Sequence, residues 1–282
     1  MQAAKRRTAF VLSASDQGTF IVNRLDHVWN RIGVGFQLLE KTSYDRDEVD
    51  GGLTLLELRR QIAGDGVMAI DCGANIGVHT VAWARGMTGW GSIVAIEAQE
   101  RIFYALAGNV ALNNCFNASV IWAAVSATNG TMRVPRVNYL EPASFGSLEL
   151  MPRPETEFIG QPIDYSDAAL TEVRTIALDS LPLDRIDLIK LDVEGMEMMV
   201  LNGARRVLAR HRPIVLAETI KSDGAALQEL FASHGYRSWL LGGVSMLAVH
   251  ESDETARRLH EIPLFAQVGK PIESPSLSPS RD

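Results

Sequence analysis

Cysteines and long apolar runs are both scarce in this sequence. Only two cysteines occur among 282 residues, Cys72 and Cys115, which is too few for a disulfide framework or a zinc cluster. No stretch approaches the ~20 uninterrupted apolar residues that a transmembrane helix requires. The apolar run at residues 9–12 is also shorter than a secretory signal core of ~7 to 15 residues. We therefore expect a cytoplasmic protein without an integral membrane segment.

Positive charge is limited as well. The chain carries 27 Lys and Arg against 34 Asp and Glu, a formal net charge of −7 at pH 7. A surface that binds nucleic acid needs a basic field to neutralise phosphates. We therefore expect no nucleic-acid partner. The hydrophobic content of 46% is enough for one sizeable core.

The stretch at residues 67–80 combines an apolar run, an acid and a glycine-containing turn. Residues 67–70 are typical of a strand, which ends in Asp71, and helical periodicity begins after Gly77. Gly73 and Gly77, with Asn75 between them, permit left-handed backbone angles and the close approach of a ligand. Such a turn presents a helix N-terminus to a carboxylate or phosphate. The pattern predicts a site for a nucleotide-like ligand.

The spacing of these residues narrows the choice of ligand. A dinucleotide site has glycines as G-x-G-x-x-G, and that spacing is absent here. Asp71 would repel a diphosphate, but it would attract the ammonium and sulfonium of S-adenosylmethionine (SAM). We therefore expect SAM as the cofactor, and a nicotinamide-dependent oxidoreductase is the less favoured alternative.

Two later strand ends extend this site. Residues 92–97 form a second apolar strand that ends in Glu97, at the interval expected of a βαβ unit. Its carboxylate can accept hydrogen bonds from both ribose hydroxyls. Ala124 and Val125, at the tip of a strand over residues 119–125, are expected to lie against the adenine.

The order of elements predicts an α/β fold. Strand and helix patterns alternate along the chain, and Gly242-Gly243 indicates a hairpin between the last two strands. We expect a doubly wound, mostly parallel seven-stranded sheet with an antiparallel terminal strand. The expected regions are a flexible leader (1–15), an N-terminal helical cap (16–66), a cofactor-binding domain (67–250) and a C-terminal extension, disordered at its end (251–282).

Two helices and one irregular segment complete this description. A helix is expected over residues 53–62, after Gly51-Gly52, and another over residues 196–209. Residues 136–174 are rich in proline and lack periodicity. We expect that segment to be a lid or a wall of the substrate site.

With these motifs in view, the sequence resembles the FkbM family of SAM-dependent methyltransferases. The resemblance rests on residues 70–77 (Ile-Asp-Cys-Gly-Ala-Asn-Ile-Gly), residues 124–126 (Ala-Val-Ser), and residues 178–181 leading to the Asp-Val-Glu-Gly of residues 192–195. It implies a class I methyltransferase fold and O-methylation of a hydroxyl on a sugar, glycan or secondary metabolite. The chain departs from the family pattern at Ala98-Gln99, where a proline is common after the acid, and at Ala127, where an acid is common.

The acids near the fourth and fifth strand ends have more than one possible role. Asp192 is expected near the methionine ammonium, and either Asp192 or Glu194 could be the base toward the acceptor hydroxyl. Because side chains alternate along a strand, we expect these two to face different targets. Glu194 could instead stabilise the N-terminus of the next helix, and Glu218 could line the acceptor pocket or be a loop acid.

Metal binding is not expected from the sequence. The six histidines show no ligand spacing near the acids, although an oxygen-only magnesium site stays open. His79 is expected to be a packing residue or to lie at the cofactor's edge. A module that binds SAM without turnover is the remaining alternative function.

Overall fold

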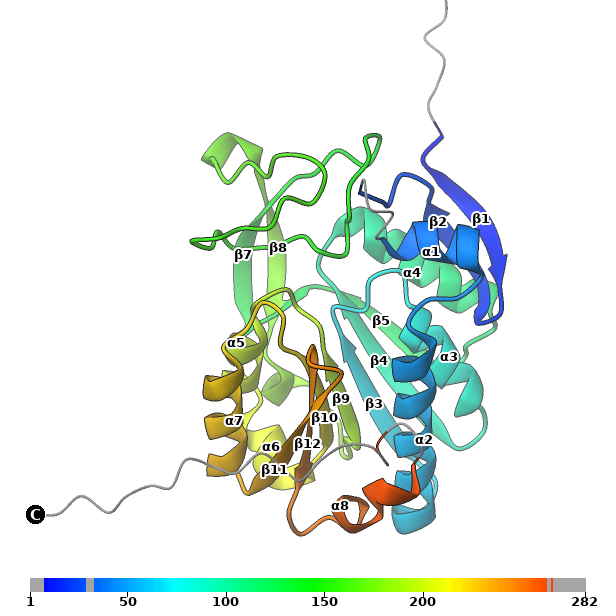
Figure 1. Ribbon diagram of the computed structural model, residues 1–282, viewed down its shortest axis with the longest axis vertical. Helices are drawn as coiled ribbons and strands as arrows, with labels where there is room; N and C mark the ends of the chain where they lie inside the picture. Colours follow the sequence, from blue (N-terminus) through cyan, green and yellow to red (C-terminus); the bar gives the residue numbers. More distant parts are fainter. Residues whose placement is uncertain (1–7, 29–32, 263–264, 266–282) are drawn as a thin grey trace, which may run out of the picture.

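A seven-stranded sheet runs through the centre of the protein in the order β11-β12-β10-β9-β3-β4-β5 (Figure 1). The computed structural model describes residues 8–28, 33–262 and 265. The strands of this sheet are β3 (Val67–Cys72), β4 (Gly91–Glu97), β5 (Ala118–Trp122), β9 (Leu188–Leu191), β10 (Ile214–Glu218), β11 (Tyr236–Leu241) and β12 (Ser245–His250). The last strand, β12, is antiparallel to both β10 and β11. The predicted fold class is confirmed, down to the hairpin at Gly242-Gly243.

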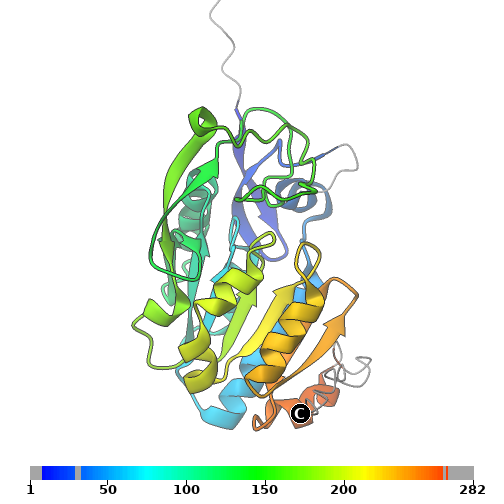
Figure 2. The same cartoon turned by 90° about the vertical axis from the view of Figure 1, so that its left-hand side faces the viewer.

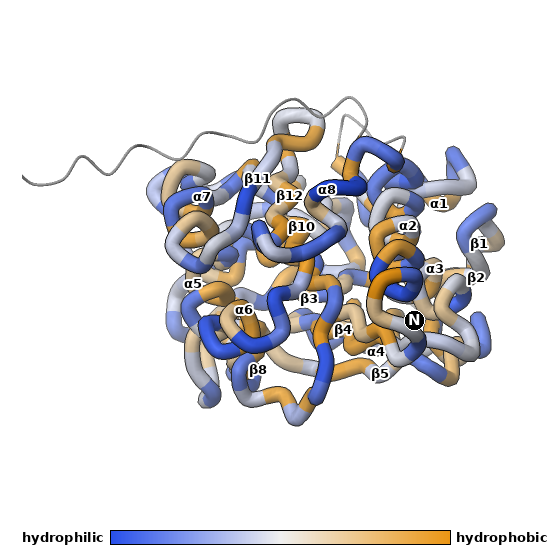
Figure 3. The backbone as a smooth tube through the Cα atoms, turned by 90° about the horizontal axis from the view of Figure 1, so that it is seen from below, coloured by the Kyte–Doolittle hydropathy of each residue, from blue (hydrophilic) through white to orange (hydrophobic). Residues whose placement is uncertain are grey.

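Helices cover both faces of this sheet. One face carries α2 (Arg46–Ala63), α3 (Val78–Gly86) and α4 (Glu100–Leu112), and the other carries α5 (Glu197–Asn202), α6 (Arg205–His211) and α7 (Gly224–Ser233). Figure 3 shows the apolar strands between these two groups. Side chains alternate accordingly: Val67 and Ala69 join one core cluster, whereas Ile70 and Cys72 join the other. Burial on both faces explains why the strands are nearly continuous apolar runs.

The N-terminal region is more ordered than the sequence indicated. Residues 10–15, expected to belong to a leader, form β1 (Phe10–Ser15), which pairs antiparallel with β2 (Gly18–Asn23). The hairpin forms because Phe20 and Val22 of β2 are fully buried. The leader prediction is therefore wrong for these residues, and residues 1–7 lie outside the described part. A short helix, α1 (Val34–Lys41), follows.

Three element boundaries also differ from prediction. Helix α2 begins at Arg46, so Gly52 lies inside it, where a Cβ would come 2.3 Å from the Trp83 ring. The expected strand over residues 119–125 is divided between β5 and β6 (Ala124–Val125). The expected helix over residues 196–209 is divided into α5 and α6 at Gly203, where a Cβ would lie 2.3 Å from the Ser126 carbonyl oxygen. At Gly203 a close contact between distant segments coincides with the break.

The segment of residues 136–174 is held in place over the carboxyl ends of the parallel strands (Figures 1 and 2). It begins after β7 (Gly130–Pro135) and ends within β8 (Leu170–Ile176). The strands β6, β8 and β7 form a second sheet in that order. The N-terminal region anchors the segment, because the Phe145 amide donates to Oδ1 of Asp26 at 3.0 Å and the Ala143 amide donates to the Leu25 carbonyl at 3.0 Å.

The C-terminal extension packs against α2. It contains α8 (Thr255–Arg258), and the chain's short 3-10 turns are η1 (Asp167–Ala169), η2 (Leu178–Ser180) and η3 (Leu259–Glu261). Arg59 of α2 pairs with Asp253 and, at 3.1 Å, with the buried Asp187. The expected disordered end lies outside the described residues. Among the described helices, none has the length and apolar character to cross a bilayer.

Candidate active site

A cavity of about 320 Å³ opens where the ends of β3, β4, β9 and β10 meet the 136–174 segment. Its volume is typical of small-molecule sites, which span ~300–1,000 Å³. Eight of the residues predicted for the site line it, namely Gly73, Asn75, Glu97, Ala124, Val125, Asp192, Glu194 and Glu218. The tertiary structure therefore gathers side chains from four strand ends into one place.

Asp71 and Gly77 do not line this cavity. Asp71 is buried, and its Oδ2 accepts a hydrogen bond from the Thr80 hydroxyl at 2.6 Å. Gly77 has φ 88°, and a Cβ there would lie 2.5 Å from Cδ1 of Leu106. Both residues shape the turn between β3 and α3, while Oδ1 of Asp71 has no hydrogen-bond partner among the described residues. Their part in ligand binding stays a prediction.

Gly73 brings the tips of β3 and β9 into contact. Its φ is 77°, and an added Cβ would lie 1.8 Å from the carbonyl oxygen of Asp192. The Asp192 amide donates to the Cys72 carbonyl at 3.1 Å on the same seam. Only glycine fits this left-handed, backbone-to-backbone position. The floor of the cavity is thus a glycine cradle, as a site for a large nucleoside cofactor requires.

Glu97 joins the turns that follow β3 and β4. Its Oε2 accepts from the Asn75 amide at 2.9 Å, and its Oε1 accepts from the Gln99 amide at 2.7 Å. Burial raises the pKa of Glu97 to about 7, and these backbone hydrogen bonds act in the opposite direction. The Ala98 amide is a third backbone donor to this carboxylate. A carboxylate offers roughly four lone-pair positions, so about one stays available to a ribose hydroxyl, and the ribose role of Glu97 stays a prediction.

Gln99 is a site residue that the sequence analysis did not assign. Its side-chain amide donates to the Phe145 carbonyl at 2.8 Å, and its Oε1 accepts from the Tyr139 hydroxyl at 3.0 Å. Where the family commonly has proline near this turn, the chain uses Gln99 to tie the cofactor side of the cavity to the 136–174 segment. The sequence signal for this role was the departure of Ala98-Gln99 from the family pattern, which commonly has a proline after the acid.

Ala124 and Val125 form an apolar part of the cavity wall. Both are nearly fully buried, and they pair with Thr175 and Ile176 of β8. The strand pairing fixes their backbone beside Glu97. That these two residues lie against the adenine stays a prediction.

The three remaining acids meet on one wall. Asp192, Glu194 and Glu218 each place a carboxylate oxygen within 4.8 Å of the others. The expectation that Asp192 and Glu194 face different targets is wrong, because β9 ends at Leu191 and Glu194 takes a left-handed φ of 54°. The strand alternation on which that expectation relied does not extend to these residues.

Two buried lysines hold two of these acids. The Nζ of Lys190 lies 2.8 Å from Oδ2 of Asp192, and the Nζ of Lys221 lies 2.5 Å from Oε2 of Glu194. Lys221 also reaches Glu157 at 2.8 Å, so it links Glu194 to the 136–174 segment. Neither lysine was predicted. Lys190, a charge inside an apolar strand, carried a sequence signal, whereas Lys221 on a polar loop carried none.

The protonation of these acids is strongly perturbed. Burial, and then the charge of Asp192, raise the pKa of Glu194 to about 7, against the opposing effect of Lys221. Burial, Asp192 and Glu194 together raise the pKa of Glu218 to about 8. Among the described residues, the side chain of Glu218 has no hydrogen-bond or ion-pair partner, although its backbone pairs with Ser245. A half-buried carboxylate with a raised pKa beside a cavity is suited to proton transfer.

The helix-capping role considered for Glu194 belongs to another residue. Oε1 of Glu197 accepts from the Val193 amide at 3.1 Å and from the Gly195 amide at 3.4 Å, while Oε2 contacts the Ser222 hydroxyl. Glu197 thereby stabilises the start of α5. Glu194 is left facing the cavity.

The sequence matches a known protein family. Residues 71–238, more than half of the chain, match the family described as Methyltransferase FkbM domain. No curated protein matches the chain. An FkbM methyltransferase from Methylobacillus flagellatus is 17% identical, with a TM-score of 0.46, over 66% of this chain and 44% of its own.

Two other solved structures show similar levels of likeness. Precorrin-6y C5,15-methyltransferase from Geobacter metallireducens is 15% identical, with a TM-score of 0.43, over 76% of this chain and 92% of its own. The N-terminal domain of human METTL16, in complex with SAH, is 13% identical, with a TM-score of 0.42, over 75% of this chain and 72% of its own.

The family match settles the cofactor. The strand ends that line the cavity carry a close-packed glycine, a buried acid and an apolar wall, and groups of these kinds can hold SAM. A nicotinamide cofactor is set aside, since the matched family transfers methyl groups. The chain belongs to the FkbM family of SAM-dependent methyltransferases.

Proposed function

We propose that the protein methylates a hydroxyl group on a sugar, a glycan or a polyhydroxylated secondary metabolite. The observation that carries this proposal is the unpaired carboxylate of Glu218 on the wall of the cofactor cavity, close to Asp192 and Glu194. A hydroxyl must lose its proton as it attacks, and a carboxylate near neutral pKa is a fitting acceptor for that proton.

Each group in the cavity then has one task. When bound, SAM supplies an electrophilic methyl on its sulfonium. Glu97 and the glycine cradle orient the nucleoside, and alignment of this kind can contribute up to ~7–11 kcal/mol. Lys190 and Lys221 hold Asp192 and Glu194 in ion pairs, so Glu218 is the acid free to take the proton, for which a base typically contributes ~10²–10⁴-fold.

The acceptor side of the cavity carries hydrogen-bonding groups beside the apolar side chains of Val34, Leu148 and Leu150. Side chains from the 136–174 segment and from the N-terminal region face it, and those with hydrogen-bonding groups include Gln37, Tyr44, Ser144, Ser147 and Glu157. Several hydrogen-bonding groups on one side of the cavity favour an acceptor with several hydroxyls. The 136–174 segment is, in this proposal, the substrate wall. The cytosol is the proposed setting, in keeping with two buried free cysteines.

An acceptor screen with isotopically labelled SAM tests the proposal. Purified protein is incubated with methyl-deuterated SAM and panels of sugars, polyols, phenols and amines, and SAH and methylated products are measured by mass spectrometry and NMR. We expect a deuterated methyl ether from a polyhydroxylated acceptor, formed about 10²–10⁴-fold more slowly by the Glu218→Gln variant. Labelled N-methyl products alone would contradict the proposal. SAM binding without SAH formation on any acceptor would favour the binding-module alternative.

A further inference from the structure

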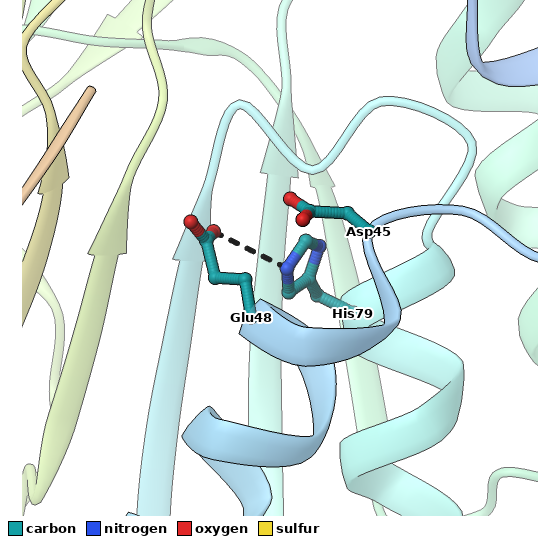
Figure 4. Close-up of side chains that lie close together, drawn as sticks. All are labelled: Asp45, Glu48 and His79. Atoms are coloured by element: carbon teal, nitrogen blue, oxygen red, sulfur yellow. Dashed lines mark ion pairs between the residues drawn. The ribbon is translucent and has the colours of Figure 1, made fainter. Parts of the chain in front are cut away.

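A second cluster of charged side chains lies beside the cavity, at the starts of α2 and α3. Asp45 precedes α2, Glu48 lies in its first turn, and His79 lies in the first turn of α3 (Figure 4). Each offers one ligand atom, and these atoms lie within 4.8 Å of one another. Proposed methyl transfer uses none of the three.

The imidazole of His79 points into this cluster, toward the carboxylate of Glu48 (Figure 4). Its side chain is only 7% exposed, and its Nε2 lies 3.4 Å from Oε1 of Glu48. That buried nitrogen has no hydrogen-bond partner among the described residues. The ring is packed edge-on against Trp83 at 5.4 Å between centroids. Leaving a buried polar atom unsatisfied costs ~1–3 kcal/mol, which a bound ligand would recover.

The spacing of the atoms suits a metal ion. Zinc-type ions bind imidazole nitrogen and carboxylate oxygen at ~2.0–2.2 Å, so neighbouring ligands of a tetrahedral site lie about 3.4 Å apart. His79 and Glu48 already stand at 3.4 Å. Oε2 of Glu48 accepts from the Ser245 hydroxyl at 3.2 Å, an outer contact of the kind that orients a ligating carboxylate. Asp45 is exposed, which leaves a side open to water.

The charges around the cluster also favour a cation. Asp71 and Lys190 are cross-strand neighbours on the face of the sheet that carries α2 and α3. Four carboxylates lie in this region, those of Asp45, Glu48, Asp71 and Asp192, together with the ammonium of Lys190. That ammonium is paired with Asp192 at 2.8 Å. A divalent ion beside Glu48 would offset this excess of negative charge.

The other group of acids is a poorer cation site. Asp192, Glu194 and Glu218 offer oxygen ligands only, and the ammonium of Lys221 already lies 2.5 Å from Glu194. The Asp45 cluster includes an imidazole nitrogen, and the ion-pair contact of that nitrogen is to Glu48, a member of the cluster itself. A mixed nitrogen and oxygen donor set favours zinc or a similar divalent transition metal over magnesium or calcium.

We propose that Asp45, Glu48 and His79 bind one divalent transition-metal ion, of the zinc class, with water completing the coordination. The ion joins the first turns of α2 and α3 beside the glycine turn. Its role is structural, and the site stands independently of which acceptor is methylated.

Metal content of the full chain tests this site directly. The protein is stripped with a chelator, incubated with Zn²⁺ or Co²⁺, desalted and analysed by plasma mass spectrometry. We expect about one metal ion per chain, a rise in the unfolding temperature, and Co²⁺ absorption bands typical of a low-coordinate site with imidazole and carboxylate ligands.

Three variants identify the ligands. Glu48→Gln and His79→Gln should weaken Co²⁺ binding by at least about tenfold, whereas Asp47→Asn, on an exposed acid of the same helix turn, should leave it unchanged. Circular dichroism and SAM titration verify that each variant is folded. If His79→Gln does not fold, the Co²⁺ affinity of Glu48→Gln is the deciding measurement. Failure of the parent protein to retain metal at micromolar concentration would overturn the proposal. Equal metal binding by all variants would do the same, and loss confined to Glu218→Gln would place the ion in the cavity instead.

Discussion

The Asn75 amide donates to Oε2 of Glu97 at 2.9 Å, across the 22 residues that separate them. Through this bond the acid at the end of β4 supports the turn after β3. Asn75 takes a left-handed φ of 51° there, a conformation that asparagine tolerates better than most residues. The structure of the turn thus depends on the carboxylate for which we predict ribose binding.

Replacing Glu97 should affect both binding and stability. Glu97→Ala removes charge-assisted contacts worth ~1.5–3 kcal/mol each, so we expect SAM affinity to fall by at least about tenfold. It also leaves the amides of Asn75 and Gln99 without an acceptor, which should lower the free energy of unfolding by ~1–3 kcal/mol. Glu97→Gln keeps one acceptor oxygen and should be intermediate. Calorimetric titration with SAM and thermal unfolding measure the two effects, and unchanged affinity in Glu97→Ala would rule out its role.

Gly73→Ala should abolish SAM binding. The new methyl would lie 1.8 Å from the Asp192 carbonyl oxygen, so the tips of β3 and β9 must separate. Gly89→Ala is a matched control, because Gly89 also has a positive φ, of 84°, yet has open space around it. SAM titration of both folded variants is the measurement. Near-normal binding by Gly73→Ala would show that the cradle is not required.

Lys221→Met should impair turnover while sparing cofactor binding. The substitution removes the ion pairs to Glu194 and Glu157, which connect the acid wall to the 136–174 segment. With the acceptor found in the screen, we expect a higher KM and lower kcat, and a Kd for SAM within about twofold of the parent value. Lys41→Met, at an exposed helix end, serves as control. A loss of SAM affinity equal to the loss of turnover would contradict this division of roles.

Turnover should rise with pH because the proposed base works only when deprotonated. The pKa of Glu218 is raised to about 8 by burial and by Asp192 and Glu194, so most of it is protonated at pH 6. We expect kcat/KM to increase through this range and to level off above about pH 8 to 9. Glu218→Gln should lose this limb and about 10²–10⁴-fold in rate. An identical pH profile in the variant would remove Glu218 from the mechanism.

Several boundaries could not have been derived from the sequence. The division of residues 119–125 between two sheets and the break at Gly203 follow from contacts between segments distant in the chain. The periodicity of apolar residues does not report such contacts, and the apolar pattern continued across residues 119–125 and across Gly203. The β1 strand was missed for a similar reason, since its partner β2 and the surface beneath it supply its stability.

What the sequence determined by itself was the alternation of strands and helices, the glycine turn after Asp71, and the acids at four strand ends. These depend on short-range patterns of burial and backbone freedom, which residues within one element carry. Only the tertiary structure decided that Lys221 meets Glu194, that Gln99 reaches Phe145, and that His79 faces Glu48. The physical reason is that such contacts form between elements, where the packing of the sheet and its helices, and not local sequence, sets the distance between side chains.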